Sequence, residues 1–132
     1  MDNKGIRIIL NFGHTVGHAL EMEAHYKMTH GEAISIGMIA ATKIALRLRK
    51  CNEDLYKRLH ALIKRAGLPT FIPLKLKIDI NHLLETMRHD KKAVDGKNRF
   101  VLPMAIGQCC KQDSISETLI ADVLKSCLVD QA

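Results

Sequence analysis

Residues 31–50 read GEAISIGMIAATKIALRLRK, and this stretch decides the expected fold. From Ala33 to Ala45 it is apolar on nearly every side when wound as a helix, which is typical of a helix buried among others. Its small residues allow neighbouring elements to approach closely. The basic end, from Arg47 to Lys50, suits a helix C-terminus, where the helix dipole favours positive charge. We therefore expect a buried central helix here.

The composition of the whole chain favours one helical domain. Its 132 residues are enough for one domain with one sizeable core. Hydrophobic residues make up 47% of the chain, but aromatic residues only 4%, so the core must be built from Leu, Ile, Ala, Val and Met. Such a mixture suits packed helices better than a sandwich or a barrel. We predict a single, mainly α, bundle-like domain over residues 1–132.

Helical spacing recurs on both sides of the central stretch. The further helices expected from it cover residues 15–26, 53–67, 80–93 and 118–128. Asn52 is a suitable cap for the second of these, and Asp79 or Asn81 begins the third. Ser114 and Glu117 fit the spacing of a capping box ahead of the last one.

Two segments do not follow helical spacing. Residues 71–78, FIPLKLKI, read as an extended connector. Residues 94–108, VDGKNRFVLPMAIGQ, carry an Asp-Gly turn signal between two short apolar runs. This arrangement predicts one small β-hairpin around the Asp-Gly pair.

Charge and cysteine content restrict the setting of the protein. The formal net charge of +6 permits nucleic acid, an anionic membrane surface or a small anionic substrate as a partner. The basic residues are scattered and no aromatic residues interleave with them, which favours a solvated surface. The four cysteines form no CxxC pair, and we find neither a signal peptide nor a run of transmembrane length. We expect free thiols in a reducing cytoplasm.

Four of the seven histidines lie in one short stretch, GHTVGHALEMEAHYKMTHGE, which covers residues 13–32. His14 and His18 are four residues apart, so on a helix both point to one side. A turn before the central helix can bring His30 back over His14. Two imidazoles bind zinc well, but a catalytic site needs a third protein ligand. Three carboxylates are candidates for it on geometry alone: Glu21, Glu23 and Glu32.

The same stretch has a plainer interpretation, in which the histidines are hydrogen-bonded core residues. Gly17 bears on this choice, because glycine inside a helix costs about 1 kcal/mol relative to alanine. Its position between His14 and His18 indicates a need for space. A ligand, a neighbouring backbone or ordinary packing would each explain that need.

Cationic and amide side chains outside this stretch are candidates for holding an anionic substrate. Arg7 can clasp a carboxylate or phosphate with two donors, and Asn11 can bond to a hydroxyl. Lys91 and Lys92 add two positive charges and could hold a phosphate. Exposed surface charge is the alternative for each of these cations, because Lys and Arg are normally exposed.

Taken in order along the chain, these motifs closely resemble the C-terminal half of 3-dehydroquinate synthases. The motifs are RIILNFGHTVGHALE, HGEAISIGM, GLP, DKK and RFVLPMAIG, and the resemblance extends from about Gly5 to Gly107. The ordered set is far more specific than any one motif. The chain is also similar, more distantly, to the helical metal-binding domain of glycerol dehydrogenases and iron-containing alcohol dehydrogenases.

The resemblance implies a lyase of the shikimate pathway that uses NAD and a divalent metal, Zn²⁺ or Co²⁺. Such enzymes convert 3-deoxy-D-arabino-heptulosonate 7-phosphate to 3-dehydroquinate and phosphate. By the family pattern, His14 and His30 are metal ligands and His18 is the catalytic histidine. His25 matches no motif position, so we interpret it as structural.

The substrate-binding positions of the family also have counterparts in this chain. By the same pattern they fall on Arg7, Asn11, Lys91 and Lys92. The resemblance further implies a small anionic sugar-phosphate substrate and a homodimer, with neither nucleic acid nor membrane as a partner.

The chain departs from the family pattern in three respects. The family's third metal ligand, a Glu, lies in an N-terminal half that is absent here, and so does the NAD-binding domain. No glycine-rich dinucleotide fingerprint is present. Asn3 also stands where the family commonly has an acidic residue. We therefore expect a C-terminal fragment of a two-domain enzyme that binds zinc weakly and is inactive alone.

Two alternatives stay open from the sequence. One is a different enzyme on the same architecture, either a related sugar-phosphate cyclase or a metal-dependent polyol dehydrogenase. Within that group, the GHTVGH motif with His18 favours dehydroquinate synthase over cyclases that act on sedoheptulose 7-phosphate. The other alternative is a non-enzymatic helical module that binds through its basic face, for which the chain shows no recognition motif.

Overall fold

A computed structural model describes residues 14–25, 27–92, 99–105, 108–113 and 115–128. The helices are α2 (His14–Glu23), α3 (His30–Arg47), α4 (Glu53–Arg65), the short 3₁₀-helix η1 (Leu74–Leu76), α5 (Ile80–Lys92) and α6 (Glu117–Ser126). The strands β1 (Arg99–Ala105) and β2 (Gln108–Asp113) form an antiparallel pair. The predicted class, a mainly helical domain, is confirmed.

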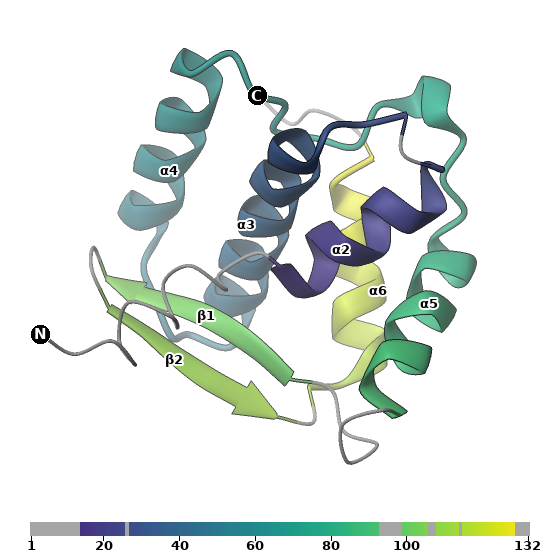
Figure 1. Ribbon diagram of the computed structural model, residues 1–132. Helices are drawn as coiled ribbons and strands as arrows, with labels where there is room; N and C mark the ends of the chain where they lie inside the picture. Colours follow the sequence, from purple (N-terminus) through teal and green to yellow (C-terminus); the bar gives the residue numbers. More distant parts are fainter. Residues whose placement is uncertain (1–13, 26, 93–98, 106–107, 114, 129–132) are drawn as a thin grey trace, which may run out of the picture.

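The helix expected at the centre of the fold is there. α3 packs against α2, α4, α6 and β1, and Figure 1 shows it standing between α4 and the other helices. Its buried residues run along most of its length, from Ala33 to Ala45. The small side chains in this run let the neighbouring elements approach α3 from several sides.

The core is aliphatic, as the composition requires. Its largest fully buried side chains include Leu20, Ile36, Ile39, Ile44, Ile72, Leu83, Ile120 and Leu124. Each buried Leu or Ile side chain contributes roughly 1.5–3 kcal/mol relative to an exposed one. The buried hydroxyls of Ser35 and Thr42 donate hydrogen bonds to the carbonyls of Glu32 and Met38, so neither is left unpaired in the core.

The helix starts follow the predicted caps with one exception. Asn52 accepts a hydrogen bond from the Leu55 amide at 3.0 Å, and Asp79 accepts one from the Asn81 amide at 2.9 Å. The capping box expected from Ser114 and Glu117 is wrong. α6 begins at Glu117, so this glutamate occupies the first helical position, whereas a capping box needs it at the third. Ser114 itself lies outside the described residues.

The strand pair lies further along the chain than predicted. β1 pairs with β2, so the chain reverses after Ala105, and the Asp-Gly pair at 95–96 lies outside the described residues. The register is irregular between Pro103 and Ala105. Proline lacks an amide hydrogen, so it fits a two-stranded sheet in which each strand keeps one unpaired edge. The mainly polar sequence QCCKQD of β2 carries little strand signal of its own.

Cys51 and Cys127 are free thiols among the described residues. Burial raises the pKa of the Cys127 thiol above its usual range, with Lys43 and Ser126 acting weakly against it. Burial also raises the pKa of Cys51. No helix in the described part of the chain is long and apolar enough to cross a membrane.

Candidate functional site

The candidate site lies where α2 and α3 meet, and Gly17 makes their contact possible. A Cβ atom at Gly17 would lie 2.8 Å from Ile34 Cδ1 and 3.0 Å from the Ala33 carbonyl oxygen. Both distances are shorter than a normal van der Waals contact. Among the explanations left open for Gly17, the structure therefore supports the close approach of a neighbouring backbone. The helix that carries His14 and His18 is thereby held against the helix that begins with His30.

A capping box sets the first residue of α3. The Thr29 hydroxyl accepts a hydrogen bond from the Glu32 amide at 3.1 Å, and the Glu32 carboxylate accepts one from the Thr29 amide at 2.8 Å. The two bonds satisfy backbone donors that the first turn of a helix otherwise leaves unpaired. The box places His30 at the N-terminus of α3, facing back towards α2. The sequence THGE at 29–32 carries the signature of this box, a Thr followed three residues later by a Glu.

His30 is joined to α2 by a short hydrogen bond. Its Nδ1 lies 2.6 Å from Glu21 Oε1. An ionised carboxylate only accepts, so Nδ1 carries the proton and donates it. The Glu21 side chain is 13% exposed and the His30 side chain 64% exposed. The bond therefore runs from a largely exposed imidazole to a well-covered carboxylate.

The backbone of α2 brings the other candidate residues to the same side. Positions 14, 18 and 21 follow one another at intervals of four and three residues, so they share one side of the helix. His18 is exposed, unlike its buried neighbours Gly17 and Ala19. The structure thus gathers position 14, His18, Glu21 and His30 along one side of the α2–α3 pair.

The three carboxylates considered as a third metal ligand each have another partner. Glu32 belongs to the capping box, Glu21 bonds to His30, and Glu23 accepts a hydrogen bond from Thr86 on α5. Within the described ranges, no group of three His, Cys, Asp or Glu residues could hold a metal ion.

The predicted substrate-binding residues are not tested by the structure. Arg7 and Asn11 lie outside the described residues. Lys91 and Lys92 form the C-terminal end of α5, a helix that packs against α2 and is tied to it by the bond between Thr86 and Glu23. Their roles stay predictions.

His25 lies apart from this group and shapes the end of α2. It is exposed and has a φ of 51°, in the left-handed region, and its amide donates to the Met22 carbonyl. Replacing it with Asn, which tolerates this conformation, is expected to leave stability unchanged. Replacing it with Val is expected to lower the free energy of unfolding by about 1–2 kcal/mol, because a β-branched residue is disfavoured there. Urea unfolding measures both effects. Loss of zinc binding in His25→Asn would instead make His25 a ligand.

Comparison with known proteins decides the family of this chain. A family model described as 3-dehydroquinate synthase C-terminal matches residues 1–93. The chain belongs to the 3-dehydroquinate synthase family. The 3-dehydroquinate synthase of a Picosynechococcus species is 48% identical over 94% of this chain, and that of a Nostoc species 47% identical over 92%. The chain spans about a third of the length of these curated relatives, 34% and 33% respectively.

Solved structures agree with the family's fold. A 2-deoxy-scyllo-inosose synthase complexed with carbaglucose-6-phosphate, NAD⁺ and Co²⁺ matches 92% of this chain and 34% of its own, with a TM-score of 0.77 and 29% identity. A 2-epi-5-epi-valiolone synthase from Streptomyces hygroscopicus, with NAD⁺ and Zn²⁺ bound, has a TM-score of 0.77 at 23% identity, over 88% of this chain and 31% of its own. Dehydroquinate synthases thus share this helical domain with other sugar-phosphate cyclases.

Proposed function

We propose that this chain provides the metal- and substrate-binding part of a 3-dehydroquinate synthase, a phosphorus–oxygen lyase of the shikimate pathway. The reaction converts 3-deoxy-D-arabino-heptulosonate 7-phosphate to 3-dehydroquinate and phosphate. The observation that carries the proposal is the joining of His30 to α2 through Glu21, beside His18 and position 14. Family membership supplies the reaction class for this arrangement.

The bond between His30 and Glu21 suits a metal-binding histidine. A ligating histidine commonly donates its second ring nitrogen to a carboxylate, and His30 does so to Glu21. We propose that His14 and His30 bind Zn²⁺ or Co²⁺, together with a carboxylate from outside the described residues. A metal held there would act as a Lewis acid towards a reacting oxygen.

The remaining residues have roles in binding and proton transfer. We propose that His18 donates or accepts a proton beside the substrate, for which its exposure next to the metal histidines is suitable. Arg7, Asn11, Lys91 and Lys92 are proposed to hold the substrate's carboxylate, hydroxyl and phosphate groups. The net charge of +6 favours the approach of such an anion.

The proposal includes NAD, bound mainly by an N-terminal domain. The curated relative is about three times as long as this chain, which is long enough to include such a domain. It also includes a homodimer. The cytoplasmic setting stays a prediction.

A related sugar-phosphate cyclase is the second candidate function. The observation in its favour is the structural match to 2-deoxy-scyllo-inosose synthase, which covers 92% of this chain. The identity to that enzyme is 29%, against 48% to a dehydroquinate synthase, so the latter activity is preferred.

The test is a chimera in which this chain replaces the corresponding C-terminal third of the Picosynechococcus relative. Phosphate release is measured with Zn²⁺ and NAD from a panel of sugar phosphates, and NADH is followed at the same time. We expect release from 3-deoxy-D-arabino-heptulosonate 7-phosphate without accumulation of NADH. The unmodified relative serves as the positive control, and His30→Ala in the chimera as the negative one.

Each outcome of this experiment separates the candidates. Release from other sugar phosphates alone would favour the related cyclase. NADH accumulation without phosphate would favour a polyol dehydrogenase. A folded chimera that binds NAD and zinc but converts none of these substrates would exclude the proposed activity.

A further inference from the structure

The hydrogen bond between Glu21 and His30 joins α2 to the first residue of α3. We propose that Glu21 is a positioning residue that fixes the tautomer and the ring orientation of His30, so that Nε2 is the nitrogen presented to the metal. The inference rests on the proposed function, because it takes His30 as a ligand. It assigns an indirect role to a carboxylate that the sequence suggested only as a direct ligand.

The two partners of this bond differ in how far they are buried. Its side chain is 64% exposed, so surrounding side chains cover only a minor part of it. The side chain of Glu21 is 13% exposed, and Glu21 lies in the last turn of α2, next in sequence to the fully buried Leu20. Glu21 is therefore the more buried of the two partners. Its position is set by the surrounding core, and its hydrogen bond in turn orients the His30 ring.

The tautomer follows from the same bond. With the Nδ1 proton donated to Glu21, Nε2 of the neutral ring carries the lone pair that a metal needs. The negative charge behind the ring also makes the imidazole a stronger donor to a cation. A carboxylate at this position therefore directs the free Nε2 lone pair of His30 outward and strengthens its bond to a cation.

The neighbouring carboxylates are directed elsewhere. Glu32 is held by the Thr29 amide in the capping box, and Glu23 bonds to Thr86 on α5. Gly17, one turn before Glu21, lets α3 come close enough for His30 to reach that carboxylate. The local structure thus matches one carboxylate with this histidine.

A purely structural role is the alternative, in which the pair only fastens α3 to α2. An ion pair with one largely exposed partner contributes about 0–1 kcal/mol to stability. Such a role would change the free energy of unfolding but not the affinity for a metal. Metal affinity and tautomer therefore separate the two explanations better than stability does.

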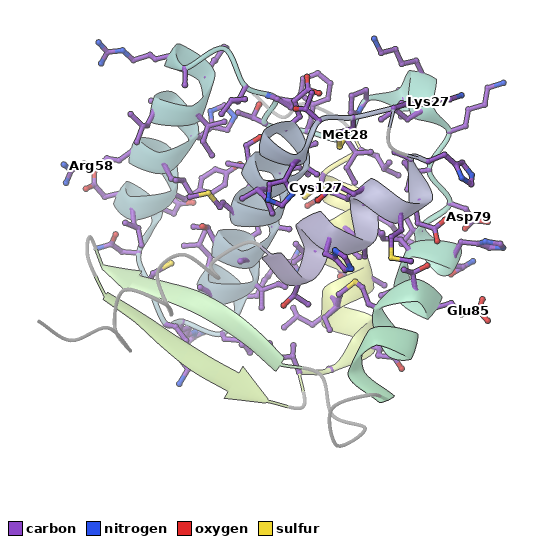
Figure 2. All side chains as sticks on the ribbon, in the orientation of Figure 1. Lys27, Met28, Arg58, Asp79, Glu85 and Cys127 are labelled. Carbon is purple, nitrogen blue, oxygen red and sulfur yellow. The ribbon has the colours of Figure 1, made fainter. Side chains whose placement is uncertain are left out.

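The test uses the chimera with Glu21→Ala and Glu21→Gln. The matched control is Glu85→Gln, because Glu85 is exposed and lies on the outer side of α5, away from α2 and α3 (Figure 2). Zinc affinity is measured by competition with a chromogenic chelator. The His30 tautomer is read from imidazole ¹⁵N shifts without metal. Urea unfolding reports stability.

We expect Glu21→Ala to weaken zinc binding by about 10–100-fold, the usual cost of losing such a partner. Glu21→Gln is expected to bind zinc more tightly than Glu21→Ala and to keep the Nδ1–H tautomer, because its amide oxygen still accepts the hydrogen bond. Glu85→Gln is expected to match the unsubstituted chimera.

Unchanged zinc affinity in Glu21→Ala would overturn the inference while leaving the proposed function intact. Reduced stability in Glu21→Ala, with zinc affinity and the Nδ1–H tautomer both retained, would assign the pair the structural role instead. Zinc affinity that His30→Ala leaves unchanged would overturn the ligand assignment and, with it, this inference.

Discussion

Replacing Gly17 with valine is expected to lower the free energy of unfolding by about 3 kcal/mol, at the upper end of the usual cost of overpacking. The new side chain would meet Ile34 Cδ1, which can move, but also the Ala33 carbonyl oxygen and Ile34 Cα, which belong to the backbone of α3. Relief therefore requires the two helices to separate. Gly17→Ala is expected to cost less, since alanine regains about 1 kcal/mol of helix propensity.

Gly31→Ala is the matched control for this prediction. A Cβ atom at Gly31 would meet nothing within 4 Å, and the residue lies in α3 directly after His30. Alanine there is expected to raise stability by up to about 1 kcal/mol through helix propensity alone. Urea unfolding of the three variants measures the contrast. Gly17→Val as stable as the unsubstituted chain would contradict the close approach of α2 to α3.

The Gly17 variants are also expected to weaken zinc binding. Ala33 and Ile34 lie one turn after His30, so a displacement of α3 at this contact moves His30 away from α2. Zinc affinity in Gly17→Ala is then expected to fall, whereas Gly31→Ala retains it.

His18→Ala in the chimera is expected to lower kcat by about 10²–10⁴-fold, the usual contribution of general acid–base catalysis. Stability is expected to change little, because the His18 side chain is exposed and not part of the core. Zinc affinity is expected to be retained, because the proposed ligands are His14 and His30. Steady-state phosphate release, zinc competition and urea unfolding together check the three expectations.

His25→Asn is the matched control for His18→Ala. His25 is another exposed histidine and lies just beyond the same helix, and asparagine tolerates its left-handed backbone. Its kcat is expected to equal that of the unsubstituted chimera. Undiminished kcat in His18→Ala would remove His18 from the proposed mechanism, and loss of zinc in that variant would make it a ligand instead.

Residues 31–50 show that a hydrophobic pattern along the chain is enough to predict a buried central helix. A stretch that is apolar on nearly every side can be stable in water only when other elements surround it, so its central position follows from composition alone. The caps at Asn52 and Asp79 were equally predictable, because each depends on a side chain and a backbone amide two or three residues away. The spacing of His14 and His18 on one side of a helix is local in the same sense.

Features that depend on contacts between residues far apart in the sequence were predicted less accurately. The strand β2, QCCKQD, forms because β1 offers it an edge, and nothing in its own sequence marks it. The Asp-Gly pair lies outside the described residues, and a turn signal says only that the chain can reverse there, whereas the observed strands pair further along the chain. The sequence also allowed three explanations for Gly17, and the helix packed against it decided between them.

The sequence by itself determined the helical class, the central helix, the family motifs and the histidines worth testing, because composition and near-neighbour spacing encode all of these. The tertiary structure alone decided which carboxylate meets which group: Glu21 with His30, Glu23 with Thr86. Glu21 and Glu23 are equivalent by composition and stand two residues apart in one helix. Successive helical positions turn by about 100°, so the two side chains face different neighbours, and only the packing of α3 and α5 around α2 determines what those neighbours are.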